Sequence, residues 1–178
     1  AETLEAAILR CGSLCEDVGA REVIVARDEA DRERLWRTRR LCSSSLREAH
    51  RWKQSEDIVI PPGSIAEMLR RVDGISARSG LLSATFGHAG DGNLHVNLLS
   101  DEDPRDAAVA ARIETALGDL FRAALDLGGT LSGEHGIGIA KARYMAWEQS
   151  AEVIDWQKRL KRLWDPQNLL NPGKIFAD

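Results

Sequence analysis

Two short apolar runs, Leu81–Phe86 and Leu94–Leu99, are joined by a connection that is rich in glycine, Gly87–Asn93. Apolar runs of this length, bounded by turn residues, are typical of β-strands. Glycines at positions 87, 90 and 92 allow the connection to turn back on itself. The sequence therefore predicts a pair of antiparallel strands with an elaborated turn between them.

Two of the chain's four histidines, His88 and His95, flank this turn. Side chains alternate along a strand, so His95 and Asn97 share a face, and a turn through Gly90 and Gly92 can fold His88 back beside them. Convergent imidazoles indicate a metal site. The alternative is that both histidines make ordinary hydrogen bonds. The glycines favour the metal site, because they weaken a strand and indicate a close approach to the backbone.

A second segment, Gly133–Gly136, carries an acid and a base between two glycines. Glu134 would complete a ligand set of two histidines and a carboxylate, which suits Zn²⁺, Mn²⁺ or Fe²⁺ and leaves positions open for water or substrate. His135 beside a cation is a candidate general base, because the positive charge discourages its protonation. Alternatively, Glu134 and His135 cap a helix that follows.

The first part of the chain shows helical and extended periods in turn. Apolar residues recur in helical period over residues 4–18, and a β-branched run over residues 22–27 predicts a strand. Asp28 is a candidate N-cap for a charged helix over residues 29–48. Three arginines that crowd one turn of that helix, at positions 37, 39 and 40, are interpreted as a solvated face unless one turns inward to bind a carboxylate.

The later elements follow the same reasoning. They are a strand at Ile58–Ile60, a helix opened by a capping box at Ser64–Glu67, a long helix from Pro104 to Gly128, a glycine-rich loop over 130–138, a helix over 153–164 and an extended tail at Asn171–Lys174. This order favours an α+β fold in which helices cover an antiparallel sheet, and a parallel doubly wound sheet fits it less well.

Length and composition limit the classes of function. A chain of 178 residues suits one domain, and a net charge of −4 gives no basic field for nucleic acid. No apolar run is long enough to span a membrane, which predicts a soluble, cytoplasmic protein. Cys11, Cys15 and Cys42 are interpreted as reduced core residues, and the five tryptophans as core or interface residues. The chain begins without methionine and already in helical period, as expected of an excised piece.

Five segments together resemble the C-terminal half of FAD-linked 2-hydroxy-acid dehydrogenases. They are Leu35–Arg39, Glu56–Pro61, Gly87–His95, Ser132–Gly138 and Leu163–Lys174. The group consists of flavoproteins of the vanillyl-alcohol-oxidase type and includes the glycolate oxidase flavoprotein subunit, D-lactate dehydrogenases and D-2-hydroxyglutarate dehydrogenase. The resemblance implies that residues 1–178 form a ferredoxin-like substrate (cap) domain, with an FAD-binding domain expected upstream.

The resemblance also implies roles at the two histidine segments. His88, His95 and Glu134 would hold a divalent metal, and His135 would take the proton from the substrate hydroxyl. The substrate would be a small 2-hydroxy acid such as glycolate or D-lactate, oxidised to the 2-oxo acid with hydride transfer to FAD.

Further residues are implied by the same resemblance. Arg39 would bind the substrate carboxylate, Ser43 stands where some relatives have threonine, and Asn97 would line the pocket. A substrate lysine would lie near Lys53–Ser55. An electron-transfer partner subunit, a homodimer and a peripheral place at the inner membrane are further expectations.

The C-terminal tail and the isolated chain carry two more expectations. Asn171 and Lys174 in the tail would contact the flavin. Because the FAD-binding domain is expected upstream, the chain alone would be colourless and inactive.

Two alternative functions would use the same residues. A metal-dependent hydrolase that acts alone would activate water with the two histidines and Glu134, with His135 as base. The absence of a His-Glu-x-x-His helix counts against the most common site of that kind. A noncatalytic assembly domain would use the glycine loops only as turns.

Overall fold

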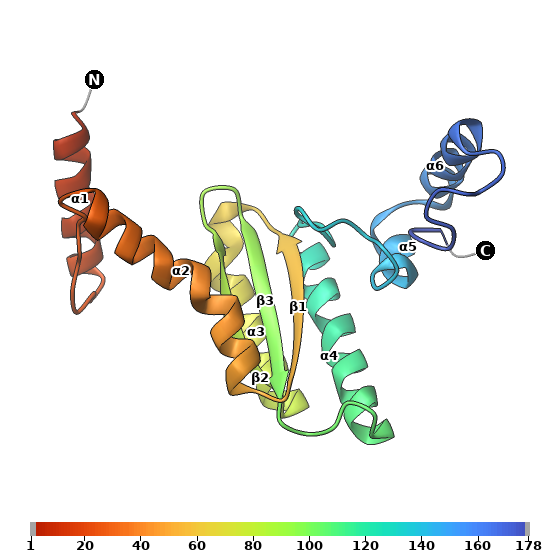
Figure 1. Ribbon diagram of the computed structural model, residues 1–178, viewed down its shortest axis with the longest axis horizontal. Coiled ribbons are helices and arrows are strands. Elements are labelled where there is room, and N and C mark those ends of the chain that lie inside the picture. Colours follow the sequence, from red (N-terminus) through yellow and green to blue (C-terminus); the bar gives the residue numbers. More distant parts are fainter. Residues whose placement is uncertain (1–2, 177–178) are drawn as a thin grey trace. The chain divides into compact units, whose positions relative to one another are not determined.

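A computed structural model describes residues 3–176 (Figure 1), and the chain separates into two compact units. The first unit is Ala1–Ser45, which contains α1 (Leu4–Asp17) and most of α2 (Glu29–Ala49). The second unit is Leu46–Asp178 and contains the sheet together with all later helices.

The two helices of the first unit confirm the helical periods read from residues 4–18 and 29–48. Asp28 caps α2 as predicted, because its side chain accepts a hydrogen bond from the backbone N–H of Asp31 at 2.8 Å.

The strand predicted over residues 22–27 is wrong. These residues belong to no strand, and Ile24 and Val25 are about half exposed. A β-branched run favours extended backbone, but a strand also needs a neighbour for its N–H and C=O groups, and the regular elements of the first unit are helices. The core assignment is likewise wrong for Cys11 and Cys15, which are exposed, while Cys42 is half-buried.

The second unit is built on a three-stranded antiparallel sheet in the order β1-β3-β2. Its strands are β1 (Trp52–Val59), β2 (Leu82–His88) and β3 (Asn93–Ser100). The predicted pair of strands is confirmed as β2 and β3, which pair along the whole length of β2.

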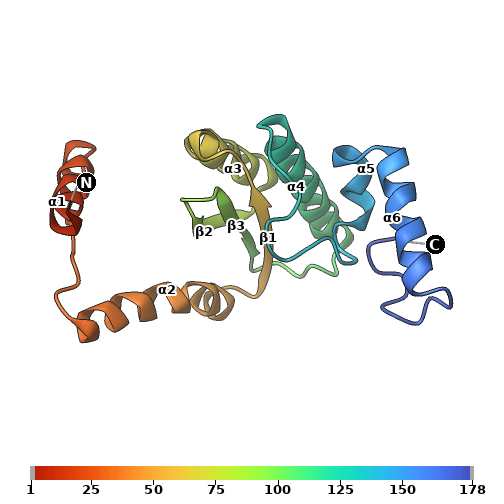
Figure 2. The same cartoon turned by 90° about the horizontal axis from the view of Figure 1, so that it is seen from above.

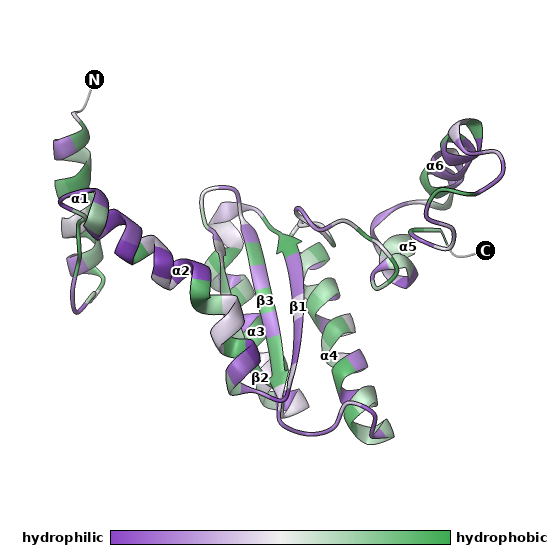
Figure 3. Ribbon diagram, viewed as in Figure 1, coloured by the Kyte–Doolittle hydropathy of each residue, from purple (hydrophilic) through white to green (hydrophobic). Residues whose placement is uncertain are grey.

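Strand β1 begins six residues before the predicted Ile58, at Trp52. The added residues are mostly polar, and Figure 3 shows β1 as largely hydrophilic except at its end. The hydrophobic pattern of the sequence therefore could not identify these added residues as part of a strand.

Helices α3 (Ile65–Ser79) and α4 (Ala107–Asp126) lie together on one face of the sheet (Figure 2). The core lies between them and the sheet. It is formed from the strands by Ile58, Leu94, Val96 and Leu98, and from the helices by Met68, Val72, Ile75, Ile113, Leu117, Leu120 and Phe121. Because side chains alternate along a strand, the residues next to these core residues in β1 and in β3 point to the opposite face of the sheet, which we call the site face.

Two predicted helix starts need correction. The capping box at Ser64 is wrong, because the Ser64 side chain makes no capping hydrogen bond and the residue ends a 3-10 turn, Pro62–Ser64. Glu67 instead pairs with Arg71 within the helix, at 3.1 Å. Helix α4 starts after Asp106 rather than at Pro104, because the Asp106 carboxylate accepts the N–H groups of the first turn.

The predicted α+β class is confirmed, with an antiparallel sheet covered by helices. The order β1-α3-β2-β3-α4 is followed by a single antiparallel bridge between Val59 and Thr130 on the free edge of β1. A ferredoxin-like fold has a fourth strand at that place, and here this bridge marks its position.

The chain ends in η2 (Ala142–Tyr144), α5 (Met145–Glu148), α6 (Ala151–Trp164) and an irregular tail. The helix predicted over 153–164 is confirmed as α6, capped by Ser150. Four of the tryptophans, at positions 36, 147, 156 and 164, are not core residues, because they are 40–79% exposed, and a place at an interface stays a prediction for them. Among the described helices, none combines the length and apolar character that crossing a membrane requires.

Candidate metal and substrate site

The connection between β2 and β3 folds His88 back toward His95, as the glycines predict. The backbone N–H of Gly92 donates to the carbonyl of His88 at 3.1 Å, and the two imidazole rings meet edge to face with centroids 5.8 Å apart. Gly92 has φ +76°, and a Cβ built there would lie 1.9 Å from the carbonyl oxygen of Ile60. The close approach to the backbone that the glycines predict is therefore made here by another part of the chain itself, the carbonyl of Ile60.

Glu134 completes the cluster from a segment far along the chain. Its Oε1 lies 3.2 Å from Nε2 of His95, and one ligand atom from each of His88, His95 and Glu134 lies within 4.8 Å of the others. His95 is buried, whereas the other two side chains are exposed. A cation bound there would be coordinated from the sheet side, and its other side would face solvent.

The environment of His95 suits a metal ligand. Burial lowers the pKa of its imidazole, the neighbouring His135 and His88 act in the same direction, and the Glu134 carboxylate opposes them. The imidazole therefore stays neutral to lower pH than usual, which keeps a nitrogen lone pair available for a cation. Two histidines and a carboxylate also match the donors that Zn²⁺, Mn²⁺ and Fe²⁺ prefer, so the residues fit a divalent transition metal.

His135 lies beside this cluster. Its ring stacks on that of His95 with centroids 5.4 Å apart, its Nδ1 is 3.5 Å from Oδ1 of Asp57, and its Nε2 is 3.9 Å from Oε1 of Glu134. The side chain is about half exposed, so a substrate could reach it. The helix-capping alternative is wrong, because the next helical turn begins only at Ala142.

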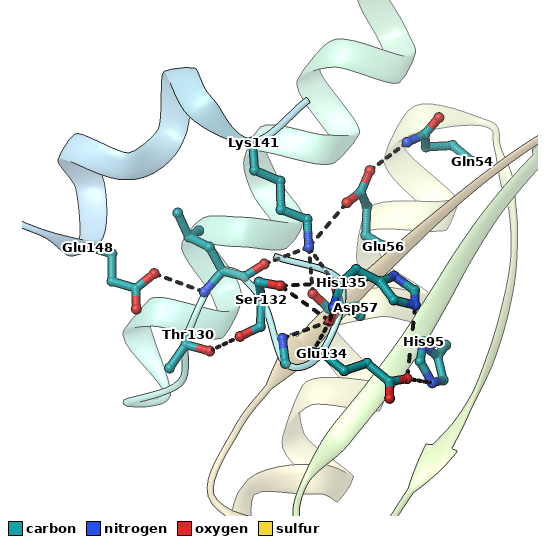
Figure 4. A network of polar contacts seen from close by, with 12 residues as sticks. Gln54, Glu56, Asp57, His95, Thr130, Ser132, Glu134, His135, Lys141 and Glu148 are labelled. Carbon is teal, nitrogen blue, oxygen red and sulfur yellow. Dashed lines mark hydrogen bonds and ion pairs between the residues drawn. The ribbon is translucent and has the colours of Figure 1, made fainter. Parts of the chain in front are cut away.

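The loop that carries Glu134 and His135 is held by Asp57, a residue that sequence reasoning did not assign to the site (Figure 4). One oxygen of the fully buried Asp57 carboxylate accepts the backbone N–H groups of Gly133, Glu134 and His135, at 2.8, 2.6 and 2.9 Å. The other oxygen accepts from the ammonium of Lys141 at 2.6 Å.

The charge state of Asp57 follows from these contacts. Burial alone would raise the pKa of its carboxyl, but the Lys141 ammonium and the N–H groups of His135 and Glu134 outweigh burial and hold the pKa well below its usual range. The sequence signals for Asp57 are its place in the segment Glu56–Pro61, which carries the family resemblance, and its position directly before the apolar run Ile58–Ile60. Neither signal indicates a role in holding the loop, and nothing in the local pattern points to Lys141.

Asn97 lies two residues after His95 on the site face, as predicted. Its amide nitrogen donates to the carbonyls of Ala84 and His95, at 2.9 and 3.1 Å. The amide oxygen is buried and has no hydrogen-bond partner among the described residues. A buried acceptor without a donor calls for a partner that the described residues do not supply.

The register of β1 distinguishes Lys53 from Gln54. Lys53 pairs with Leu99 in β3, two residues from Asn97, and so points to the site face. Gln54 pairs with Leu98 of the core face, and its amide donates to Glu56 at 2.6 Å.

The other predicted residues lie on separate segments. Arg39 and Ser43 are four residues apart on α2, so they share a helix face within the first unit. Asn171 and Lys174 bond to each other in the tail at 3.1 Å. The tail is joined to the loop after His135, because the N–H of Ile175 donates to the carbonyl of Gly138 at 2.7 Å.

Comparison with known proteins identifies a family and several relatives. The family of FAD linked oxidases, C-terminal domain, matches residues 1–175. The chain is 38% identical over 176 residues to the glycolate oxidase subunit GlcD of Bacillus subtilis, which covers 99% of this chain and 37% of that protein. It is 35% identical to a D-lactate dehydrogenase of Archaeoglobus fulgidus, covering 91% and 35%, and 30% identical to a D-2-hydroxyglutarate dehydrogenase of Stutzerimonas stutzeri, covering 86% and 33%. The chain thus spans about a third of each relative.

Proposed function

Because this chain belongs to the family of FAD linked oxidases, C-terminal domain, we propose that it supplies the substrate- and metal-binding part of an FAD-dependent 2-hydroxy-acid dehydrogenase. The enzyme would oxidise a 2-hydroxy acid of the glycolate or D-lactate type to the 2-oxo acid. In this proposal residues 1–178 act as one domain, and FAD is bound mainly by an upstream portion. The observation that carries the proposal is the convergence of His88, His95 and Glu134 beside His135.

In the proposed site, His88, His95 and Glu134 hold a divalent cation, Zn²⁺, Mn²⁺ or Fe²⁺. When bound, such a cation polarises the oxygens of the substrate as a Lewis acid and lowers the pKa of its hydroxyl group. The burial of His95 supports this role, because an imidazole that stays neutral is ready to bind without first losing a proton.

His135 is the proposed general base. It takes the proton of the substrate hydroxyl while the hydrogen on C2 leaves with its electron pair, so that a C=O bond replaces the C–H and O–H bonds. FAD, when bound, supplies the acceptor for that hydride. The stacking of His135 on His95 and its contact with Asp57 support the role, because they limit the orientations of the imidazole.

The substrate carboxylate has several candidate partners. Arg39 offers a planar fork that matches a carboxylate, and Ser43 lies one helical turn away on the same helix. From the sheet, Lys53 and Asn97 share the site face with His95. In the tail, Asn171 and Lys174 remain the proposed contacts to the flavin.

The proposal extends to partners and location. We also propose that the protein is soluble and lies in the cytoplasm. An electron-transfer partner subunit, a homodimer and a peripheral place at the inner membrane are further proposals. A metal-dependent hydrolase acting alone and a noncatalytic assembly domain are not favoured, because the similar proteins of known activity are named oxidases and dehydrogenases.

A binding experiment on the 178-residue chain tests the proposal without requiring flavin. Calorimetry with Zn²⁺ and Mn²⁺ should show one site, lost in His88→Ala and in His95→Ala but kept in His50→Ala, the matched control at the fourth histidine. Glycolate and D-lactate should then bind only with metal, and propionate, which lacks the hydroxyl, should bind more weakly. Metal binding that survives both His88→Ala and His95→Ala would refute the proposal.

A further inference from the structure

A buried lysine lies behind the proposed site and takes no part in the reaction described above. The Lys141 side chain is only 5% exposed, and its ammonium donates to the Asp57 carboxylate at 2.6 Å, to the Asp57 carbonyl at 2.8 Å and to the Leu131 carbonyl at 2.8 Å. An ammonium group has three N–H donors, so these bonds use all of them. Lys141 therefore joins β1 to the beginning of the loop that carries Glu134 and His135.

Asp57 continues this connection into the loop itself. Its Oδ2 accepts three successive backbone N–H groups, and the hydroxyl of Ser132 lies 3.3 Å from Oδ1 (Figure 4). Successive N–H groups that converge in this way form a site for a negative charge. Because residues 132–137 have no helix or strand of their own, the carboxylate replaces the backbone ladder that would otherwise order the loop.

The sheet register links the ordered loop to the proposed metal ligands. Asp57 is the direct cross-strand partner of His95, so the residue that holds the loop and the buried histidine share one rung of the β1–β3 ladder. From this rung the loop places Oε1 of Glu134 3.2 Å from Nε2 of His95 and stacks His135 on the His95 ring. A shift of the loop would move Glu134 and His135 together.

We propose that Asp57 and Lys141 are positioning residues, which fix the loop against β1 and thereby set the metal affinity through Glu134 and the placement of His135. The inference rests on the proposed function. A purely structural ion pair would affect stability alone, whereas a positioning pair also controls the geometry of the metal site in protein that is fully folded.

Charge-neutral variants of similar shape separate these two roles. Asp57→Asn would turn an amide toward the Lys141 ammonium or toward the three N–H groups, and Lys141→Met would keep the length of the side chain without its charge. Each single variant leaves a buried charge without its nearest counter-charge and should lower Tm by roughly 10 °C. The double variant Asp57→Asn/Lys141→Met removes both of these charges and should regain part of that loss, because the buried Glu56 carboxylate, 3.5 Å from the Lys141 ammonium, then keeps, among the described residues, only its bond from the Gln54 amide.

The experiment measures Co²⁺ binding to the 178-residue chain by calorimetry and by the visible absorption of the bound ion. We expect Kd to rise about 10- to 100-fold in Asp57→Asn and to stay raised about 10-fold or more in the double variant, with an altered Co²⁺ spectrum. Arg143→Met, which breaks the exposed pair with Glu114, is the matched control and should leave both readouts unchanged.

Recovery of Tm, Kd and spectrum together in the double variant would overturn the proposal, as would an unchanged Kd in any folded variant of the pair. The double variant keeps the test decisive if Asp57→Asn fails to fold. If the unsubstituted chain binds Co²⁺ through His95 but the pair has no influence, only this inference fails. If the unsubstituted chain binds no Co²⁺, the proposed function fails with it.

Discussion

Asp57 and His95 lie directly opposite each other in the β1–β3 ladder, and each contacts the loop 133–135 with its side chain. Asp57 binds the backbone of the loop and His95 meets the Glu134 carboxylate, so one rung of the sheet sets both the position of the loop and one proposed metal ligand.

Metal addition should stabilise the folded chain. A ligand that binds only the folded state at 100 times its Kd adds about 2.7 kcal/mol, so Mn²⁺ should raise Tm by roughly 5–10 °C. The increase should disappear with EDTA and be absent in His95→Ala, as followed by circular dichroism. An equal increase in His95→Ala would place the binding elsewhere.

Gly92→Ala should destabilise the chain by at least about 2 kcal/mol, because alanine is strained at φ +76° and its Cβ would meet the Ile60 carbonyl. Gly90→Ala in the same turn is the matched control, since a Cβ there has no atom within 4 Å. Urea unfolding of both variants measures the difference. Equal stability of the two would contradict the described turn.

Asn97→Asp should cost about 2–4 kcal/mol, since a carboxylate cannot donate to the carbonyls of Ala84 and His95 and would be buried without a cation. Asn168→Asp on the exposed surface serves as the control and should change the free energy of unfolding by less than about 0.5 kcal/mol. A tolerated Asn97→Asp would show that these bonds contribute little.

Lys53→Met should weaken the metal-dependent binding of D-lactate about 10-fold, while Gln54→Met should leave it nearly unchanged. The register of β1 points Lys53 to the site face and Gln54 to the other face. Calorimetry on the metal-loaded chain compares the two variants. A larger effect of Gln54→Met would reverse this assignment.

Stability should fall in acid partly through Asp57, whose folded-state pKa lies well below its usual range. Its stabilising contribution is complete above the pKa of about 3.9 in the unfolded chain and decreases below it, because the unfolded chain then binds a proton that the native carboxylate does not. The free energy of unfolding should therefore fall more steeply below pH 4 in the natural chain than in Asp57→Asn/Lys141→Met. Parallel pH curves from urea unfolding would argue against this role of Asp57.

Local patterns were sufficient for much of the second unit. The apolar runs around Gly87–Asn93 predicted β2 and β3, and strand alternation placed Asn97 beside His95. Helix α6 followed from its helical period. Such signals are carried by residues close in sequence, and glycine directly marks where the backbone has to turn sharply.

The sequence alone determined the paired strands, their turn and the residues with the chemistry for a metal site. Tertiary structure decided what depends on a distant partner: residues 22–27 have the composition of a strand but no neighbour, and the register of β1 separates Lys53 from Gln54. It also decided the pairing of Asp57 with Lys141, 84 residues later, because a buried charge is stable only where the fold brings its partner to it.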